Sequence, residues 1–299
     1  MAEQGAGTRI DSLLVAAAAA LQPLDDAPRF EAELLLCEVL GWPRSRLYAC
    51  PEHQPSASER AAYAALVARR VAGKPLAYLL GSQPFMDFTL AVTPDVLIPR
   101  ADTETLVQAA LASEAASATA PQVLDLGTGS GAVAIALARA RPRWHLTATD
   151  ISEAALLVAQ ANANRLGVAD RIRFLVADWF HGLPDDRRYD LLVSNPPYVA
   201  EADPHLADPG IAAEPRHALV AGPEGLDALH RIAAEAPLRL KPGGWLWLEH
   251  GHEQGPAVRD LLARLGYHAV DTHRDAGGRE RVTGGRHAPI SRTDHKEST

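Results

Sequence analysis

The apolar residues between position 8 and about position 82 recur at the spacing of an α-helix. They predict a first helix over Leu13–Leu21 and a second over Phe30–Leu40, which Gly41 would end. Ser56-Ala57-Ser58-Glu59 has the spacing of a capping box and precedes a third helical run, Arg60–Ala72. Charges of both signs are mixed without a basic stripe. We therefore expect this region either to pack against the rest of the chain or to recognise a partner.

Residues 84 to 98 change to a two-residue period, which is the pattern of a half-buried strand. Phe85, Phe88 and Leu90 belong to a first apolar run, and residues 96 to 98 form a second. Thr93-Pro94-Asp95 lies between them and has turn chemistry. We therefore predict a β-hairpin linker over residues 84–100, with its turn at residues 93–95.

From about residue 101 onwards, helical and strand-like patterns alternate. Such alternation predicts an α/β domain with an open, largely parallel sheet and helices on both faces. The predicted parts are a helical domain (1–83), the hairpin linker (84–100), the α/β domain (101–286) and a disordered tail (287–299). Within the α/β domain we expect a loop at 113–120, strands at 123–126, 145–149, 172–177, 189–194 and 245–249, helices at 132–140 and 226–240, a turn at 241–244, and a terminal hairpin of 267–273 and 279–283.

Composition narrows the functional classes. The chain has 299 residues, is 47% hydrophobic and 22% charged, and carries a formal net charge of −8, which argues against an obligate duplex-DNA binder. Cys37 and Cys50 form no C-x-x-C pair, so neither a disulfide framework nor a metal site is predicted, and we expect a cytoplasmic protein. The apolar run Leu13–Leu21 is too short to cross a bilayer, and no export signal is recognised.

A glycine-rich turn follows the predicted strand at 123–126. Its residues Gly127, Thr128, Gly129, Ser130 and Gly131 precede an alanine-rich helix. Glycines allow a ligand to approach the backbone, and a helix N-terminus favours an anionic group. The next strand ends at Asp150, where a carboxylate can bind ribose hydroxyls. The pattern fits both a nicotinamide dinucleotide and S-adenosyl-L-methionine.

Two acidic positions favour S-adenosyl-L-methionine. Asp125 lies just before the glycines, where its carboxylate could bind an ammonium group but would repel a pyrophosphate. Asp178 and Trp179 end a third strand, where an acid and a ring could meet an adenine. Core packing is an equally good explanation of Trp179.

Asn195-Pro196-Pro197-Tyr198 follows another apolar strand directly. Each proline fixes its own φ and removes a backbone donor, so the loop is stiff. It offers an amide oxygen and backbone carbonyls that can accept both hydrogens of a planar –NH2 group, while Tyr198 stacks on its plane. A rigid turn is the alternative for an isolated run of this kind.

Other features have open roles. Residues 199–222 have little periodicity and are either a lid that closes over the substrate or a surface loop. Arg100 either approaches the substrate or forms a salt bridge. The motif His250-Gly251-His252 lacks a completing metal-ligand spacing and is expected to be structural.

Taken together, these motifs resemble those of the peptide chain release factor glutamine methyltransferases. The resemblance covers nearly the whole chain. Its most specific parts are the predicted hairpin with the residues that follow it (98–104) and the Asp-Pro-His-Leu segment at 203–206. The matching segments are 87–88, 97–100, 103–104, 125–131, 178–180, 194–198, 203–206, 214–215, 248–251 and 280–282.

The resemblance implies a Rossmann-like class I S-adenosylmethionine-dependent methyltransferase domain behind a small helical domain that contacts the release factor. It implies N5-methylation of the glutamine in the Gly-Gly-Gln tripeptide of class 1 release factors. From charge and hydropathy we expect no direct nucleic-acid or membrane partner, and we expect a monomer. Asn195, Pro196 and Tyr198 would be catalytic, and Pro197 would complete the substrate clamp. The cofactor-binding residues would be Asp125, Gly127, Thr128, Gly129, Ser130, Gly131, Asp150, Asp178, Trp179 and Asn195.

Three alternatives differ from this interpretation. A DNA adenine-N6 methyltransferase uses a similar tetrapeptide on a flipped base, but it would need a basic duplex-binding region that the sequence does not offer. A ribosomal-protein glutamine methyltransferase fits the hairpin and the segment at 203–206 less well. A non-catalytic cofactor-binding module would have no need of an amide clamp at residues 195–198.

Overall fold

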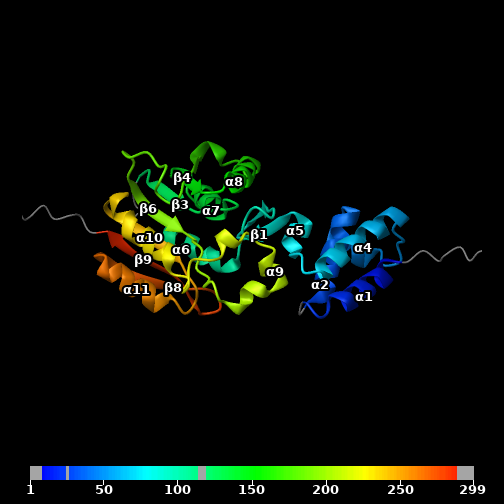
Figure 1. Ribbon diagram of the computed structural model, residues 1–299. Helices are drawn as coiled ribbons and strands as arrows, with labels where there is room; N and C mark the ends of the chain where they lie inside the picture. Colours follow the sequence, from blue (N-terminus) through cyan, green and yellow to red (C-terminus); the bar gives the residue numbers. More distant parts are fainter. Residues whose placement is uncertain (1–8, 25–26, 114–118, 288–299) are drawn as a thin grey trace, which may run out of the picture. The chain divides into compact units, whose positions relative to one another are not determined.

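The computed structural model describes residues 9–24, 27–113 and 119–287 (Figure 1). The chain divides into two compact units. One comprises Met1–Ser82 with Pro204–Ala213, and the other comprises Gln83–Asp203 with Glu214–Thr299. Among the described residues, no helix is long and apolar enough to cross a membrane.

The first unit is helical. Its three predicted helices are confirmed as α1 (Ile10–Leu21), α2 (Pro28–Leu40) and α4 (Ala57–Val71). The predicted capping box is also present, because the Glu59 backbone nitrogen donates to Ser56 Oγ (3.2 Å) and the Ser56 nitrogen donates to Glu59 Oε2 (2.6 Å). The short helices α3 (Arg44–Ala49), α5 (Leu76–Leu80) and α9 (Pro209–Ala212) were not predicted, since they span too few residues to show a period. The buried side chains of this unit include Leu14, Leu21, Leu35, Leu36 and Tyr63.

The linker hairpin is shorter than predicted. Its strands are β1 (Ser82–Phe85) and β2 (Phe88–Ala91), so the turn lies at Met86-Asp87 and not at residues 93–95. Residues 96–98 form no strand. The Ile98 backbone nitrogen donates instead to the buried carboxylate of Glu214 (3.0 Å), which replaces the missing strand partner.

The second unit contains a seven-stranded sheet with the order β5-β4-β3-β6-β7-β9-β8. The first five strands in this order are parallel, and β9 and β8 are antiparallel additions, as the predicted terminal hairpin requires. The strands are β3 (Gln122–Leu126), β4 (His145–Asp150), β5 (Ile172–Val176), β6 (Tyr189–Ser194), β7 (Leu240–Glu249), β8 (Tyr267–Arg274) and β9 (Glu280–His287). Strand order reverses between β3 and β6, and such switch points are where open α/β sheets bind ligands.

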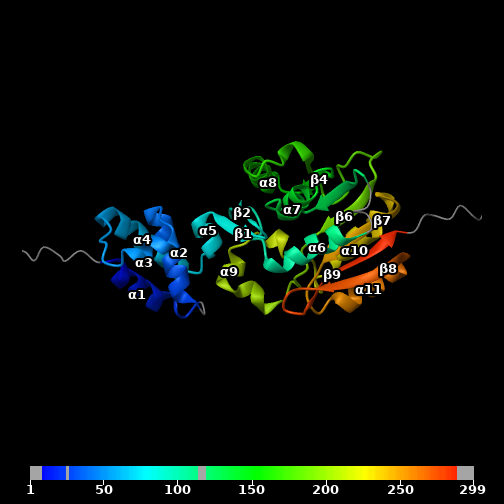
Figure 2. The same ribbon diagram turned by 180° about the vertical axis from the view of Figure 1, so that it is seen from behind.

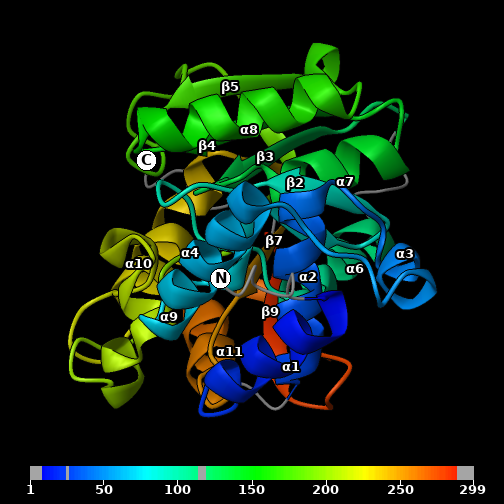
Figure 3. The same ribbon diagram turned by 90° about the vertical axis from the view of Figure 1, so that its right-hand side faces the viewer.

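Helices cover both faces of this sheet, as predicted (Figures 1 and 2). α6 (Glu104–Ala112) and α7 (Ala132–Ala140) pack on one face, and α10 (Asp227–Glu235) and α11 (Gly255–Arg264) on the other. α8 (Glu153–Arg165) lies alongside β4 and β5 (Figure 3). Successive side chains of β3 point to opposite faces of the sheet, so the strand contributes to the apolar core on each face. Val123 faces α6 and α7, and Leu124 faces α10 and α11.

Three predicted boundaries need correction. The helix predicted at 226–240 ends at Glu235, because Pro237 follows and its ring is incompatible with a helix interior. The turn predicted at 241–244 is part of β7, at an irregularity in its pairing with β6. His287, predicted to begin a disordered tail, ends β9, while 288–299 and the centre of the loop predicted at 113–120 lie outside the described residues.

Candidate active site

A pocket of about 450 Å³ lies at the carboxyl ends of β3, β4 and β6. This is the edge where the strand order reverses, and its volume is typical of small-molecule sites. Of the predicted site residues, the following line it: Asp125, Gly127, Thr128, Gly129, Ser130, Asp150, Asp178, Trp179, Asn195 and Pro197. Gly131, Pro196 and Tyr198 do not line it directly.

The glycine-rich turn forms one wall of the pocket. Gly127 and Gly129 have φ values of 70° and 54°, which favour glycine. A Cβ on Gly129 would meet no atom within 4 Å, so the space beside the backbone is open to a ligand. Gly131 acts differently, because a Cβ there would lie 2.9 Å from Ile135 and 3.2 Å from Ala159. Gly131 therefore allows α7 to begin close against α8.

Asp125 supports the turn from within. It is 1% exposed, and its Oδ2 accepts hydrogen bonds from Thr128 Oγ1 (2.6 Å) and from the Ala134 backbone nitrogen (3.2 Å). Burial raises its pKa to about 7, although both hydrogen bonds lower it. Asp125 was predicted to face a ligand, but its Oδ2 instead accepts hydrogen bonds from the glycine-rich turn and from the start of α7.

Asp150 and Asp178 lie on the same pocket with different partners. Asp150 Oδ2 accepts from the Gly129 nitrogen (2.9 Å) and its Oδ1 from the Ser152 nitrogen (2.9 Å), so the acidic strand end and the glycine turn are tied together. Asp178 forms an ion pair with Arg231, with contacts of 3.0 to 3.1 Å, and the sequence offered no signal for that partner.

Trp179 adopts a left-handed backbone conformation with φ of 52°, which is rare for a large side chain. Its ring lies 3.6 Å from the position that a Cβ on Gly127 would take. The ring also packs against the core on the α10 side of the sheet while lining the pocket. Both interpretations of Trp179, core packing and ligand contact, therefore describe part of its position.

The Asn-Pro-Pro-Tyr loop leaves β6 at the opposite side of the switch point. Ser194 Oγ donates to the Leu126 carbonyl (2.8 Å) and joins the tips of β6 and β3. Asn195 Nδ2 donates to Thr103 Oγ1 (3.1 Å), which leaves Oδ1 as an acceptor beside the pocket. Sequence reasoning assigned no role to Thr103, a buried residue at the start of α6.

Tyr198 is directed toward a buried carboxyl group. Its hydroxyl donates to Glu249 Oε1 (3.3 Å), and burial, followed by the nearby Glu249 charge, raises the pKa of Tyr198. Glu249 ends β7 with no exposed surface, and burial raises its pKa to about 7. The nearby hydroxyl groups of Thr103 and Tyr198 lower that pKa in part, and Glu249 Oε2 has no hydrogen-bond partner among the described residues.

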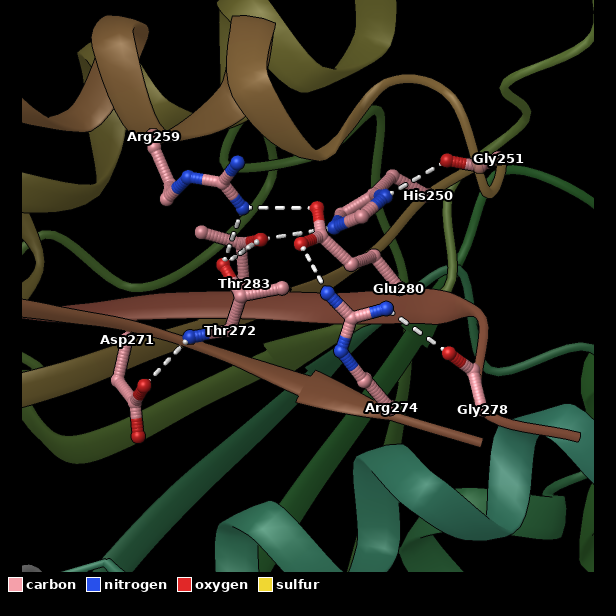
Figure 4. A network of polar contacts seen from close by, with 9 residues as sticks. All are labelled: His250, Gly251, Arg259, Asp271, Thr272, Arg274, Gly278, Glu280 and Thr283. Atoms are coloured by element: carbon pink, nitrogen blue, oxygen red, sulfur yellow. Dashed lines mark hydrogen bonds and ion pairs between the residues drawn. The ribbon is translucent and has the colours of Figure 1, made fainter. Parts of the chain in front are cut away.

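A polar network joins α11, β8 and β9 to His250, the residue after β7 (Figure 4). Arg259 donates to Thr272 (3.0 Å), Thr272 contacts Thr283 (2.9 Å), and Thr283 contacts Nε2 of the buried His250 (2.8 Å). The Nδ1 atom of His250 faces the Gly251 carbonyl (2.8 Å), an acceptor, so Nδ1 carries the hydrogen and Nε2 accepts from Thr283.

The network continues to the loop itself. Gln254 Oε1 accepts from the Gly251 nitrogen (2.8 Å), and its Nε2 donates to the Tyr198 carbonyl (3.0 Å). Burial lowers the pKa of His250, which keeps its imidazole neutral and the order of donors unchanged. The described residues contain no group of His, Cys, Asp or Glu that could hold a metal.

The irregular segment predicted at 199–222 contains short helical turns at Pro204–Ala207, Pro209–Ala212 and Arg216–Ala218. Its two ends pair, because the Val199 nitrogen donates to the Leu219 carbonyl (2.8 Å). Arg100 forms an ion pair with the buried Glu214, the salt bridge that was one of its two predicted roles.

The chain is similar to known proteins along most of its length. Residues 12–81 match the family model described as PrmC N-terminal domain, and residues 102–220 match the Methyltransferase small domain. A release factor glutamine methyltransferase of Bordetella pertussis is 52% identical over 258 residues, or 86% of this chain and 94% of that protein. One from Pseudomonas aeruginosa is 46% identical over 267 residues, or 89% and 95% of the respective chains.

A solved structure supports the fold. The T. thermophilus 16S rRNA N2 G1207 methyltransferase in complex with AdoMet and guanosine has a TM-score of 0.51 and 22% identity, over 69% of this chain and 49% of that one. The predicted α/β methyltransferase fold is thus confirmed. The predicted cofactor, S-adenosyl-L-methionine, is confirmed by the match to a methyltransferase family. By sequence similarity along most of its length, the chain belongs to the family of release factor glutamine methyltransferases.

Proposed function

We propose that this protein methylates the side-chain amide nitrogen of the glutamine in the Gly-Gly-Gln tripeptide of class 1 peptide chain release factors. Family membership supports the reaction and the class of substrate. The observation that carries the proposal is the orientation of Asn195, whose Nδ2 is turned to Thr103 while Oδ1 stays available beside the pocket. A carbonyl acceptor there suits an –NH2 group and does not suit a carboxylate or a phosphate.

The residues of the pocket fit S-adenosyl-L-methionine. The open backbone at Gly129 and the indole of Trp179 offer contacts to a nucleoside, and Asp150 offers its carboxylate to a ribose diol. Asp125 would place a buried carboxyl group near the cofactor's ammonium, and a bound cation would favour its charged form. When bound, this cofactor supplies an electrophilic methyl group on a sulfonium.

The chain's own contribution is placement. An amide nitrogen is a poor nucleophile, because its lone pair is delocalised into the carbonyl group. Asn195 Oδ1 and the Pro196 carbonyl would accept its two hydrogens and hold it in line with the pocket. Well-aligned reacting groups lower a barrier by up to about 7–11 kcal/mol in ideal intramolecular cases. Methyl transfer leaves the amide nitrogen positively charged and strongly acidic. It can therefore lose its proton without a dedicated base.

We further propose that the helical domain at residues 1–83 binds the release factor and that residues 199–222 close over the glutamine to exclude water. Support for the first comes from the match of residues 12–81 to the N-terminal family model. Support for the second comes from the irregular course of the segment and the pairing of its ends at Val199 and Leu219. We expect the enzyme to act as a cytoplasmic monomer without direct nucleic-acid contact.

The test is transfer of labelled methyl from S-adenosyl-L-methionine to purified class 1 release factor. Factor with its Gly-Gly-Gln glutamine replaced, duplex DNA and ribosomal proteins serve as alternative acceptors. Asn195→Ala should lose at least about 100-fold in turnover and keep much of the cofactor affinity. Asn164→Ala, at an exposed position of α8 away from the pocket, is the matched control. Label on DNA or on a ribosomal protein, or unchanged turnover in Asn195→Ala, would contradict the proposal.

A further inference from the structure

The side chain of Gln254 does not cap the helix that it precedes. Gln254 occupies the N-cap position of α11, where shorter polar side chains normally accept from the helix backbone, but its own side chain makes no such bond. It turns back instead, so that Oε1 accepts from the Gly251 nitrogen (2.8 Å) and Nε2 donates to the Tyr198 carbonyl (3.0 Å). The amide therefore joins the start of α11 to the last residue of the Asn-Pro-Pro-Tyr loop, 56 residues earlier in the sequence.

The backbone partners of this amide fix its orientation. A backbone N–H group can only donate and a backbone carbonyl can only accept, so Oε1 must face Gly251 and Nε2 must face Tyr198. The same nitrogen also contacts the carbonyls of Gly225 (3.3 Å) and Glu224 (3.4 Å). The two hydrogens of Nε2 thus serve one short bond to the loop and longer contacts to the turn at residues 224–225.

The Tyr198 carbonyl group is closely covered by the chain. A Cβ on Gly225 would lie 2.3 Å from the carbonyl oxygen, and Gly225 has a φ of 72°, so only a glycine can approach the group in this way. The Tyr198 hydroxyl contacts Glu249 Oε1 at 3.3 Å. Tyr198 is therefore held at its backbone by Gln254 and at its ring by Glu249.

The contact to Gln254 anchors the second end of the Asn-Pro-Pro-Tyr loop. The first end is anchored by Ser194, whose Oγ donates to the Leu126 carbonyl (2.8 Å). Between the two anchors, each of the two prolines has a fixed φ. Little freedom then remains for the stretch of backbone that carries the Asn195 side chain and the Pro196 carbonyl.

We propose that Gln254 is a positioning residue for methyl transfer, which holds the Tyr198 carbonyl and so keeps the acceptors of Asn195 and Pro196 in place for the substrate amide. The inference rests on the proposed function and deepens it. Neither Gln254 nor Tyr198 lines the pocket, so the cofactor can bind without this contact. Loss of the contact should therefore lower turnover much more than cofactor affinity.

The same amide secures the segment that leaves the loop. That segment returns at Gly222, whose carbonyl accepts from the Glu201 nitrogen (3.0 Å). Three residues later, Gly225 offers one of the carbonyls that Gln254 contacts. The substrate clamp and the base of this segment therefore depend on one side chain.

The first experiment compares Gln254→Glu, Gln254→Met and Gln160→Glu in the methyl-transfer assay, at a temperature where thermal unfolding shows each protein to be folded. Gln254→Glu keeps the shape and the acceptor for Gly251 but sets a carboxylate oxygen against the Tyr198 carbonyl. We expect kcat to fall at least about tenfold, with the Kd for S-adenosyl-L-methionine within about twofold.

Two further variants complete this comparison. Gln254→Met keeps the length of the side chain and removes the amide without adding a charge, so kcat should fall here too, and the test stays valid if Gln254→Glu folds poorly. Gln160→Glu makes the same chemical change at an exposed position of α8 and should keep the wild-type kcat.

The second experiment observes the contact itself, without release factor or cofactor. Tyr198-Val199 is the only Tyr-Val pair in the chain, so 13C in tyrosine carbonyls and 15N in valine give a single coupled NMR signal. A carbonyl carbon resonates further downfield when its oxygen accepts a hydrogen bond. The Tyr198 carbonyl signal should therefore move upfield in Gln254→Met and stay unchanged in Gln160→Glu.

Wild-type kcat in the folded Gln254 variants, an unmoved Tyr198 carbonyl signal, or a loss of cofactor affinity as large as the loss of kcat would each overturn the inference. These results differ from failure of the proposed function. In that case the wild type itself would transfer no label to the release factor, while the carbonyl signal would still move in Gln254→Met.

Discussion

Asp125 should make the stability of the folded chain decrease as pH rises, and Asp125→Asn should remove that effect. The native carboxyl group is buried with a pKa of about 7, whereas an unfolded aspartate has a pKa of about 3.9. Between these values the native state holds a proton that the unfolded state has released. The free energy of unfolding therefore falls by up to about 1.4 kcal/mol per pH unit, and by about 2 kcal/mol in all from pH 5 to pH 7, because the native group itself begins to ionise near pH 7.

The side-chain amide of the Asp125→Asn variant would be neutral throughout this range and contribute no slope. The free energy of unfolding of Asp125→Asn should therefore rise relative to that of the wild type by about 2 kcal/mol between pH 5 and pH 7, then level off. Any constant cost of the amide at this site is the same at each pH and cancels from the comparison. Other groups, among them the buried His250, titrate equally in both proteins and cancel too.

The assay is urea unfolding at fixed ionic strength, without cofactor, at half-unit steps from pH 5 to pH 8. Tryptophan fluorescence reports mainly on the α/β unit, because four of the chain's five tryptophans (144, 179, 245 and 247) belong to it. Asp186→Asn, at an exposed position, should keep the wild-type slope. Parallel pH dependences for the wild type and Asp125→Asn would refute the reasoning.

The remaining predictions concern other parts of the structure. Gly225→Ala should reduce turnover strongly, because a Cβ would lie 2.3 Å from the Tyr198 carbonyl oxygen and would displace the loop; methyl transfer measured beside Gly210→Ala, where nothing lies within 4 Å, tests this. Arg70→Met should destabilise the first unit by about 3–5 kcal/mol, because it leaves the buried Glu31 carboxylate unpaired; Glu31→Gln in the same chain should recover part of the loss in thermal unfolding. Trp179→Ala should raise the Kd for S-adenosyl-L-methionine in calorimetric titration, and an unchanged Kd would limit this ring to core packing.

The α/β domain and the edge of the sheet that carries the site could be predicted from the sequence alone. Each predicted motif follows an apolar strand directly, and parallel strands place their carboxyl ends on one edge. Gly127, Asp150 and Asn195 could therefore be assigned to one site from the sequence. Local signals also identified the long helices of the first unit, since capping and period depend on neighbouring residues alone.

The pairing of polar groups across the fold depends on packing and could not be predicted from the sequence. Thr103 and Glu249 meet Asn195 and Tyr198 from α6 and β7, and no spacing along the chain predicts such contacts. The same applies to Arg231 beside Asp178. The raised pKa values of Asp125 and Glu249 arise from burial, a property of packing around a residue and not of the residue itself, so composition and motif could not predict them.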